Sequence, residues 1–124
     1  MRAAAFDRIQ EMRMSTAAEA LKEMNARFLT LSKAAPQVFG AFRNLMTESS
    51  KDGLLPAKLK ELVAVAIATH QGCEDCIVFH VSNAKKHGAR REELVEIHGV
   101  SIEMGGGPGA VYASKALAAF DALA

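Results

Sequence analysis

The chain has 124 residues, of which 50% are hydrophobic and 23% are charged. This length and composition predict one folded domain over residues 1–124 and exclude an intrinsically disordered chain. Fifteen basic and fourteen acidic residues give a net charge of +1. A balance of this kind is not the electrostatic pattern of a nucleic-acid-binding or membrane-binding protein, so we expect neither partner.

Two further absences in the sequence favour a cytoplasmic location. The main apolar run, residues 62–68, is much shorter than the roughly 20 residues that a spanning helix needs. The first fourteen residues mix charged and small side chains and lack the apolar core of a signal peptide. We therefore expect a cytoplasmic protein.

The composition also favours helices, since the chain has three prolines, one tyrosine and no tryptophan. No segment shows the sustained two-residue alternation of a half-buried strand. The sequence therefore predicts an all-α fold, a compact bundle of about six helices.

The first part of the chain predicts three helices. A weak helix covers about residues 3–13, and Thr16 with Glu19 has the spacing of a capping box that opens a second helix. Pro36 suits the first position of a third helix, where its missing N–H costs nothing. Residues 49–53 then form a loop.

Pro56 starts a helix whose second half, residues 62–68, is apolar on every side, which predicts a helix buried all round. Residues 70–72 interrupt the pattern, and another helix is expected from Cys73 to His87. Gly88 suits the position just after its end.

The last part of the chain predicts two helices. Arg91 opens the first, the Gly-Gly-Gly-Pro run at residues 105–108 breaks the pattern, and Pro108 opens the second. His98 lies on a mostly apolar helix face, which is typical of a packed histidine with satisfied hydrogen bonds.

Four residues combine into a pattern that favours chemistry. Cys73, Cys76 and His80 have i, i+3 and i+7 spacing, so all three project from one face of the expected helix. Thiols in a first helical turn are stabilised as thiolates by free amides and the helix dipole. His80 can exchange a proton one turn beyond Cys76, and Glu61 on the preceding helix can orient His80 or a water.

Each of these residues also has a plain interpretation, because paired cysteines are often buried hydrophobes and a single histidine is usually structural. The fixed spacing of all four favours function. Zinc could use the two cysteines with His70, His80 or His87, but no second ligand pair with finger spacing exists. We therefore expect no metal and no other cofactor.

The spacing of these four residues resembles a known family. Glu61, eleven residues, Cys73-Glu74-Asp75-Cys76, three residues and His80 match the Glu-x11-Cys-x2-Cys-x3-His motif of alkylhydroperoxidase D-like proteins, within the wider carboxymuconolactone decarboxylase family. The resemblance covers about residues 21–112.

This resemblance implies a small all-α thiol peroxidase that reduces hydroperoxides with a dithiol or protein thiol as reductant. Cys76 would be the peroxidatic thiol and Cys73 the resolving thiol that the reductant attacks. Glu61 and His80 would form the proton relay that deprotonates Cys76.

The motif departs from the better-known peroxidases at one position. Those proteins have a histidine just before the second cysteine, and this chain has Asp75. A carboxylate beside a thiol disfavours its ionisation.

Two alternative functions stay open: a carboxymuconolactone decarboxylase-type lyase, whose members do not need the cysteine pair, and a non-enzymatic redox or metal-binding module.

The surplus of apolar helix surface and the near-zero net charge also predict a homo-oligomer, a trimer or a hexamer.

Overall fold

The computed structural model describes residues 2–124, apart from the side chains of residues 10 and 13–15. It contains α1 (Arg2–Ala34), α2 (Pro36–Ser50), α3 (Ala57–Gln71), α4 (Glu74–Lys86) and α5 (Arg91–Ala122). Gly106 interrupts α5 with φ of 60° and ψ of −139°, so α5 consists of two helices and the described residues form six helical stretches. The all-α prediction is confirmed, and the described residues include no strand.

The two helices expected before residue 34 are one continuous helix, so the predicted capping box at Thr16 is wrong. The hydroxyl of Thr16 instead donates a hydrogen bond to the carbonyl of Met12, at 2.8 Å. A threonine inside a helix commonly bonds the carbonyl four residues back. No glycine or proline lies between residues 2 and 34, so nothing in the sequence forces the helix to end.

Turn residues end the other helices close to where the sequence places them. Pro36 is the first residue of α2, but α2 continues to Ser50, so the loop spans residues 51–56. Pro56 caps α3 rather than beginning it, and the Asp52 carboxylate accepts a hydrogen bond from the Ala57 amide at 2.7 Å. This carboxylate satisfies one of the amides that every helix start leaves free.

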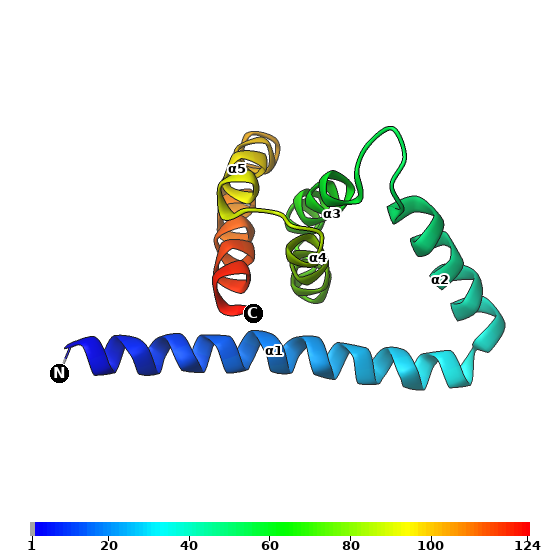
Figure 1. Ribbon diagram of the computed structural model, residues 1–124, viewed down its shortest axis with the longest axis horizontal. Helices are drawn as coiled ribbons and strands as arrows, with labels where there is room; N and C mark the ends of the chain where they lie inside the picture. Colours follow the sequence, from blue (N-terminus) through cyan, green and yellow to red (C-terminus); the bar gives the residue numbers. More distant parts are fainter. Residues whose placement is uncertain (1) are drawn as a thin grey trace.

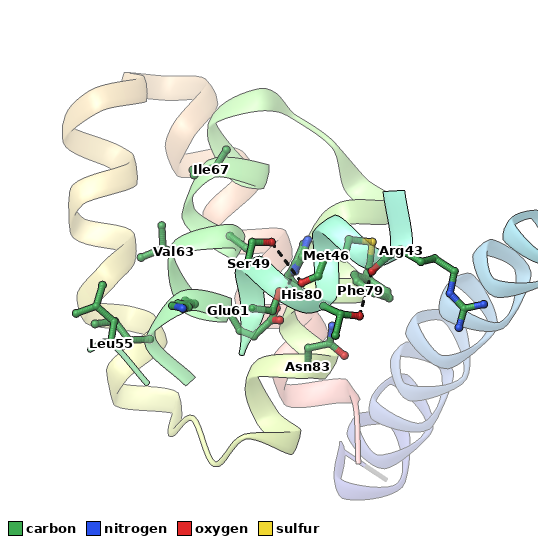
Figure 2. A pocket seen from close by; sticks show the side chains of 15 residues that line it. Arg43, Met46, Ser49, Leu55, Glu61, Val63, Ile67, Phe79, His80 and Asn83 are labelled. Atoms are coloured by element: carbon green, nitrogen blue, oxygen red, sulfur yellow. Dashed lines mark hydrogen bonds and ion pairs between the residues drawn. The ribbon is translucent and has the colours of Figure 1, made fainter. Parts of the chain in front are cut away.

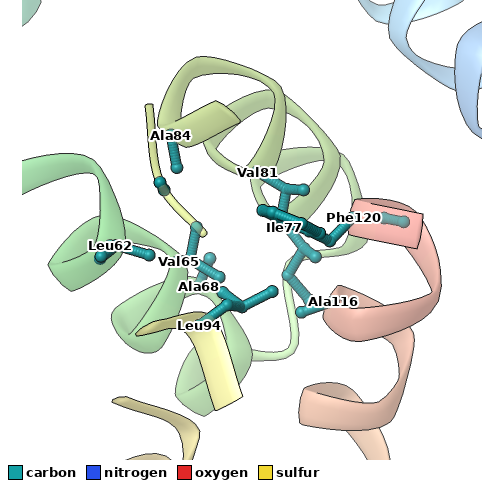
Figure 3. Close-up of a cluster of buried hydrophobic side chains, with 11 residues drawn as sticks. Leu62, Val65, Ala68, Ile77, Val81, Ala84, Leu94, Ala116 and Phe120 are labelled. Atoms are coloured by element: carbon teal, nitrogen blue, oxygen red, sulfur yellow. The ribbon is translucent and has the colours of Figure 1, made fainter. Parts of the chain in front are cut away.

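The hydrophobic core lies between α3, α4 and α5 (Figure 3). Its fully buried side chains include Val65 of α3, Ile77 and Val81 of α4, and Leu94 of α5. The two halves of α5 also approach closely, because a Cβ added at Gly109 would lie 2.7 Å from the Ser101 carbonyl oxygen. Only glycine fits there without a shift of the backbone.

The helix α1 passes along one side of this core, and α2 stands apart from it beyond the loop (Figure 1). Because the core covers only part of α3, the prediction that residues 62–68 are buried all round is wrong. Val63 is 42% exposed and Ile67 is 52% exposed, whereas Leu62 and Val65 of the same helix are buried. The open face of α3 becomes a wall of the cavity described below.

Within the described residues, no helix combines the length and the apolar character that crossing a membrane requires.

Candidate active site

A tight turn between α3 and α4 places the helix that carries Glu61 against the helix that carries Cys76 and His80. Gly72 ends α3 in the left-handed conformation, with φ of +69°. A Cβ at Gly72 would meet the Tyr112 ring at 3.1 Å, so both backbone and space favour glycine here. The chain then reverses, and α4 packs against α3 with Cys73 at its start.

Cys73 is the residue that caps α4, one position before the first helical residue, Glu74. The expected helix start is therefore shifted by one residue. The Cys73 sulfur accepts a hydrogen bond from the Cys76 amide at 3.3 Å. A sulfur at this place faces the free amides of the first turn, which stabilise negative charge.

Cys73 and Cys76 are joined by a disulfide, with their Cα atoms 5.2 Å apart. The two sulfurs thus meet within the first turn of α4. Both cysteines are partly buried, and Cys76 packs against the hydrophobic core. The pair therefore has the geometry that a dithiol–disulfide couple needs.

Glu61 and His80 form a direct pair between α3 and α4. The Oε2 atom of Glu61 lies 2.7 Å from Nδ1 of His80. Glu61 is 4% exposed, so its carboxylate is held away from water. When Nδ1 of a neutral His80 donates to this carboxylate, Nε2 keeps its lone pair and is the nitrogen that can accept a proton.

Glu61 and His80 also line a cavity of about 620 Å³ between α2, α3 and α4 (Figure 2). Its apolar wall includes Val63 and Ile67 of α3 and Phe79 of α4. Neither cysteine is among its lining residues in the described part of the chain. The imidazole of His80 therefore borders this cavity, and Cys76 lies one turn before His80, toward the start of α4.

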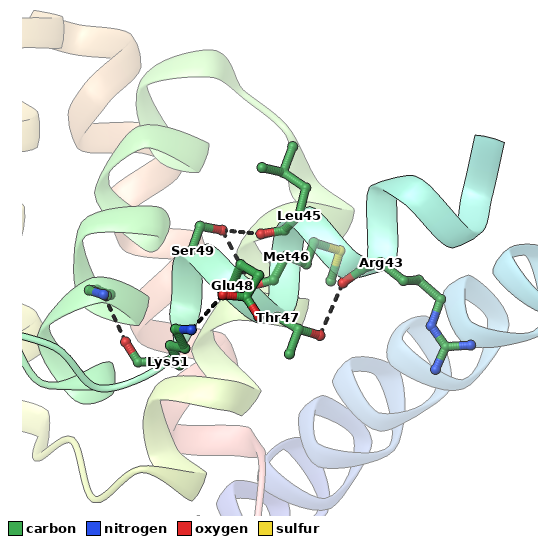
Figure 4. Close-up of polar contacts among 8 residues, drawn as sticks. Arg43, Leu45, Met46, Thr47, Glu48, Ser49 and Lys51 are labelled. Atoms are coloured by element: carbon green, nitrogen blue, oxygen red, sulfur yellow. Dashed lines mark hydrogen bonds and ion pairs between the residues drawn. The ribbon is translucent and has the colours of Figure 1, made fainter. Parts of the chain in front are cut away.

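The end of α2 forms the opposite rim of this cavity, and local hydrogen bonds fix its shape (Figure 4). Thr47 donates to the carbonyl of Arg43 at 3.0 Å, and Ser49 donates to that of Leu45 at 2.7 Å. The Lys60 ammonium of α3 donates to the carbonyl of Lys51 at 2.7 Å, which ties the loop after α2 to α3.

Two ion pairs beside the disulfide could not be found from the sequence. Arg27 of α1 pairs with Asp75, and Lys115 of α5 pairs with Glu74, so both acidic residues between the cysteines have a basic partner. The hydrogen bond to Glu74 raises the pKa of Lys115. The partners are 48 and 41 residues apart in the chain, and no local spacing signals such contacts.

His98 does not have the satisfied hydrogen bonds that its helix position predicts. The residue is 4% exposed, and neither ring nitrogen has a hydrogen-bond partner among the described residues; the same holds for the hydroxyl of Ser101. The prediction is right about packing and wrong about the polar atoms. Burial lowers the pKa of His98, because the protonated ring would lose its hydration.

The lowered pKa of His98 predicts how stability depends on pH. The unfolded chain binds a proton at His98 below about pH 6.5, whereas the folded chain resists protonation until a lower pH, so the free energy of unfolding falls as the pH drops. We expect His98→Leu to match the wild type near neutral pH and to lose less stability toward about pH 5. Urea unfolding at both pH values measures this, and an equal loss in both proteins would contradict the assignment.

Within the described residues, no three His, Cys, Asp or Glu side chains gather as a metal site would require. The candidate zinc ligands His70 and His87 lie at the ends of α3 and α4, and both are exposed.

Together, the fold and the site define a class: helical domains with a cysteine pair at a helix start and a buried carboxylate–imidazole pair beside it. The chain belongs to the carboxymuconolactone decarboxylase family, whose family model matches residues 36–119. The match includes all four site residues, and the resemblance inferred from the motif is confirmed at the level of the family.

Relatives and solved structures agree with this assignment. An uncharacterized protein of Cupriavidus necator is 54% identical over 103 residues, which cover 83% of this chain and 91% of the relative. A carboxymuconolactone decarboxylase family protein of Legionella pneumophila has a crystal structure similar to this fold, with a TM-score of 0.82, 38% identity and coverage of 85% of this chain and 94% of that chain. A Thermotoga maritima structure has a TM-score of 0.70 and 28% identity, covering 85% of this chain and 90% of that one.

Proposed function

We propose that the protein is a thiol-dependent peroxidase that reduces hydroperoxides through Cys76 and Cys73. The observation that carries this proposal is the 2.7 Å contact between Glu61 and His80, placed one turn along α4 from a cysteine pair within disulfide distance. A nucleophile, a base and a carboxylate that orients the base are the parts of an activated thiol.

In the proposed reaction, His80 accepts the proton of Cys76, and the thiolate attacks the terminal oxygen of the hydroperoxide. The S–O bond forms as the O–O bond breaks, and the departing alkoxide takes a proton from His80 to become an alcohol. The Cys73 thiol then attacks the sulfur of the Cys76 sulfenic acid, which forms the disulfide and releases water. An external dithiol restores both thiols and is itself oxidised to a disulfide.

This cycle predicts that the cysteine pair is oxidised and reduced without unfolding of the domain. Free-thiol counting on the reduced protein should show both cysteines, and mild peroxide treatment should remove both. The helical signal in circular dichroism should stay constant, because the bond closes within one turn of α4. Thiols that survive the treatment, or a loss of helicity on oxidation, would argue against the proposal.

We also propose that the protein is a homo-oligomer, a trimer or a hexamer. Among the phenylalanines, Phe39 and Phe120 are buried within the subunit, and Phe42 is 46% exposed. Further large apolar side chains are exposed on α1, α2 and α3: Phe6, Ile9, Met12, Val38, Leu45, Val63 and Ile67. Apolar surface of this extent favours association when the net charge is near zero.

Light scattering coupled to size exclusion tests the assembly. We expect a mass three or six times the 13.3 kDa of one chain, and we expect it to persist on dilution. A stable, folded species at the mass of one chain would show that a single subunit is sufficient.

A further inference from the structure

The short segment between the cysteines carries two carboxylates, and each is paired with a cation from a different helix. Asp75, next to Cys76, lies 2.5 Å from the guanidinium of Arg27 on α1. Glu74, next to Cys73, pairs with the ammonium of Lys115 on α5. The four side chains are between 50% and 63% exposed, so these are surface pairs placed directly beside the redox centre.

Unpaired carboxylates at this turn would oppose the effect of the helix start. The free amides of α4 favour a thiolate, whereas a negative charge on the neighbouring residue disfavours it. The sign of the net effect therefore depends on how far Asp75 and Glu74 are neutralised by their partners.

We propose that Arg27 and Lys115 are positioning residues of the redox centre, which offset the charges of Asp75 and Glu74 and so keep the thiols of the reduced protein able to ionise. This proposal rests on the proposed function in one respect, because both take the thiolate as the nucleophile. It explains how the chain can carry Asp75 beside the second cysteine and keep that cysteine reactive.

The other titratable groups around the cysteine pair do not supply this positive charge. On α4, His80 is hydrogen-bonded to Glu61 of α3. At the end of α3, His70 lies against Gly105 of α5, where a Cβ would be 3.5 Å from its Nδ1 atom. On α5, the centre of the Tyr112 ring lies 5.3 Å from the Lys115 ammonium. The described cations in contact with the two acids are therefore Arg27 and Lys115.

The test measures thiolate formation directly and needs no peroxide. The rate of alkylation by iodoacetamide is followed against pH in the Cys73→Ser background, so that Cys76 alone reacts. Arg27→Gln should move the midpoint of the profile to higher pH and slow alkylation near neutral pH by about threefold, a size typical of an exposed pair. Arg27→Lys should restore the rate, and the difference should shrink in about 1 M salt.

The Asp75→Asn background shows whether Arg27 acts through Asp75 or directly on the Cys76 thiolate. In that background Arg27→Gln should change the profile much less, because no carboxylate is left to neutralise. Lys115→Gln, measured in the Cys76→Ser background, should slow alkylation of Cys73 in the same way. An Arg27→Gln effect of equal size with and without Asp75, or no effect at all, would overturn the proposal.

Arg91→Gln is the matched control. Arg91 is 52% exposed and pairs with Asp121, so this variant removes a similar surface pair. That pair lies near the far end of α4, where Lys85 bonds the carbonyl of Phe120. In the Cys73→Ser background, Arg91→Gln should leave the alkylation profile of Cys76 unchanged. If Arg27→Gln leaves alkylation normal and the wild type is an active peroxidase, this proposal alone is overturned. If Arg27→Gln shifts the alkylation profile as predicted but the wild type has no peroxidase activity, only the proposed function is overturned.

Discussion

Replacement of Cys76 by serine is expected to abolish hydroperoxide turnover, because the proposed reaction begins at this sulfur. His80 lies one helical turn beyond Cys76 on the same face of α4, so Cys76 is the cysteine that the imidazole can serve as base. Serine has similar size but cannot act as an easily ionised nucleophile. Consumption of hydroperoxide with a dithiol donor measures the loss.

Replacement of Cys73 by serine should give a different result from that of Cys76. One equivalent of hydroperoxide should still be reduced, after which the sulfenic acid on Cys76 has no resolving thiol. Trapping with a sulfenic-acid reagent and mass spectrometry would locate it. If Cys73→Ser blocked the first turnover while Cys76→Ser allowed it, the two roles would be reversed.

Loss of the relay is expected to slow the reaction of Cys76 with hydroperoxide by about 10²–10⁴-fold, the usual contribution of a positioned acid or base. His80→Ala removes the base. Glu61→Gln keeps the size of the buried side chain but removes the carboxylate that holds Nδ1 of His80 at 2.7 Å. Stopped-flow measurement of the first oxidation gives the rate without any contribution from the reductant.

A suitable control for the relay is His87→Ala, which removes an exposed imidazole at the other end of α4. This variant should react at the rate of the wild type. Unchanged rates in both Glu61→Gln and His80→Ala would show that the contact between these residues is structural and that Cys76 is activated by other means.

Much of the fold could be predicted because its boundaries depend on local backbone chemistry. Pro36, Gly72 and the break at Gly106 each end or begin a helix through a conformational preference that the sequence carries by itself. The capping pattern at Thr16 was misleading, because a threonine hydroxyl can either cap the start of a helix or, inside a helix, donate a hydrogen bond to a preceding carbonyl. Thr16 does the second.

The site could be predicted where its geometry is that of one helix. The spacing of Cys73, Cys76 and His80 fixes their common face, and the sequence places Glu61 on the preceding helix, from which it reaches His80. The partners of Asp75 and the unsatisfied nitrogens of His98 depend on how distant helices meet, which periodicity does not describe. The exposed face of α3 was missed for the same reason. An apolar sequence shows which side chains a helix can bury, but it does not show which other helices cover them.

The most direct test of the peroxidase proposal is catalytic consumption of an organic hydroperoxide with dithiothreitol as the only reductant. The wild type should convert many equivalents to the alcohol, with one dithiol oxidised for each hydroperoxide, and the double variant Cys73→Ser/Cys76→Ser should convert none above the buffer. Hydroperoxide that persists with the wild type, or that disappears equally fast with the double variant, would contradict a cysteine-based peroxidase.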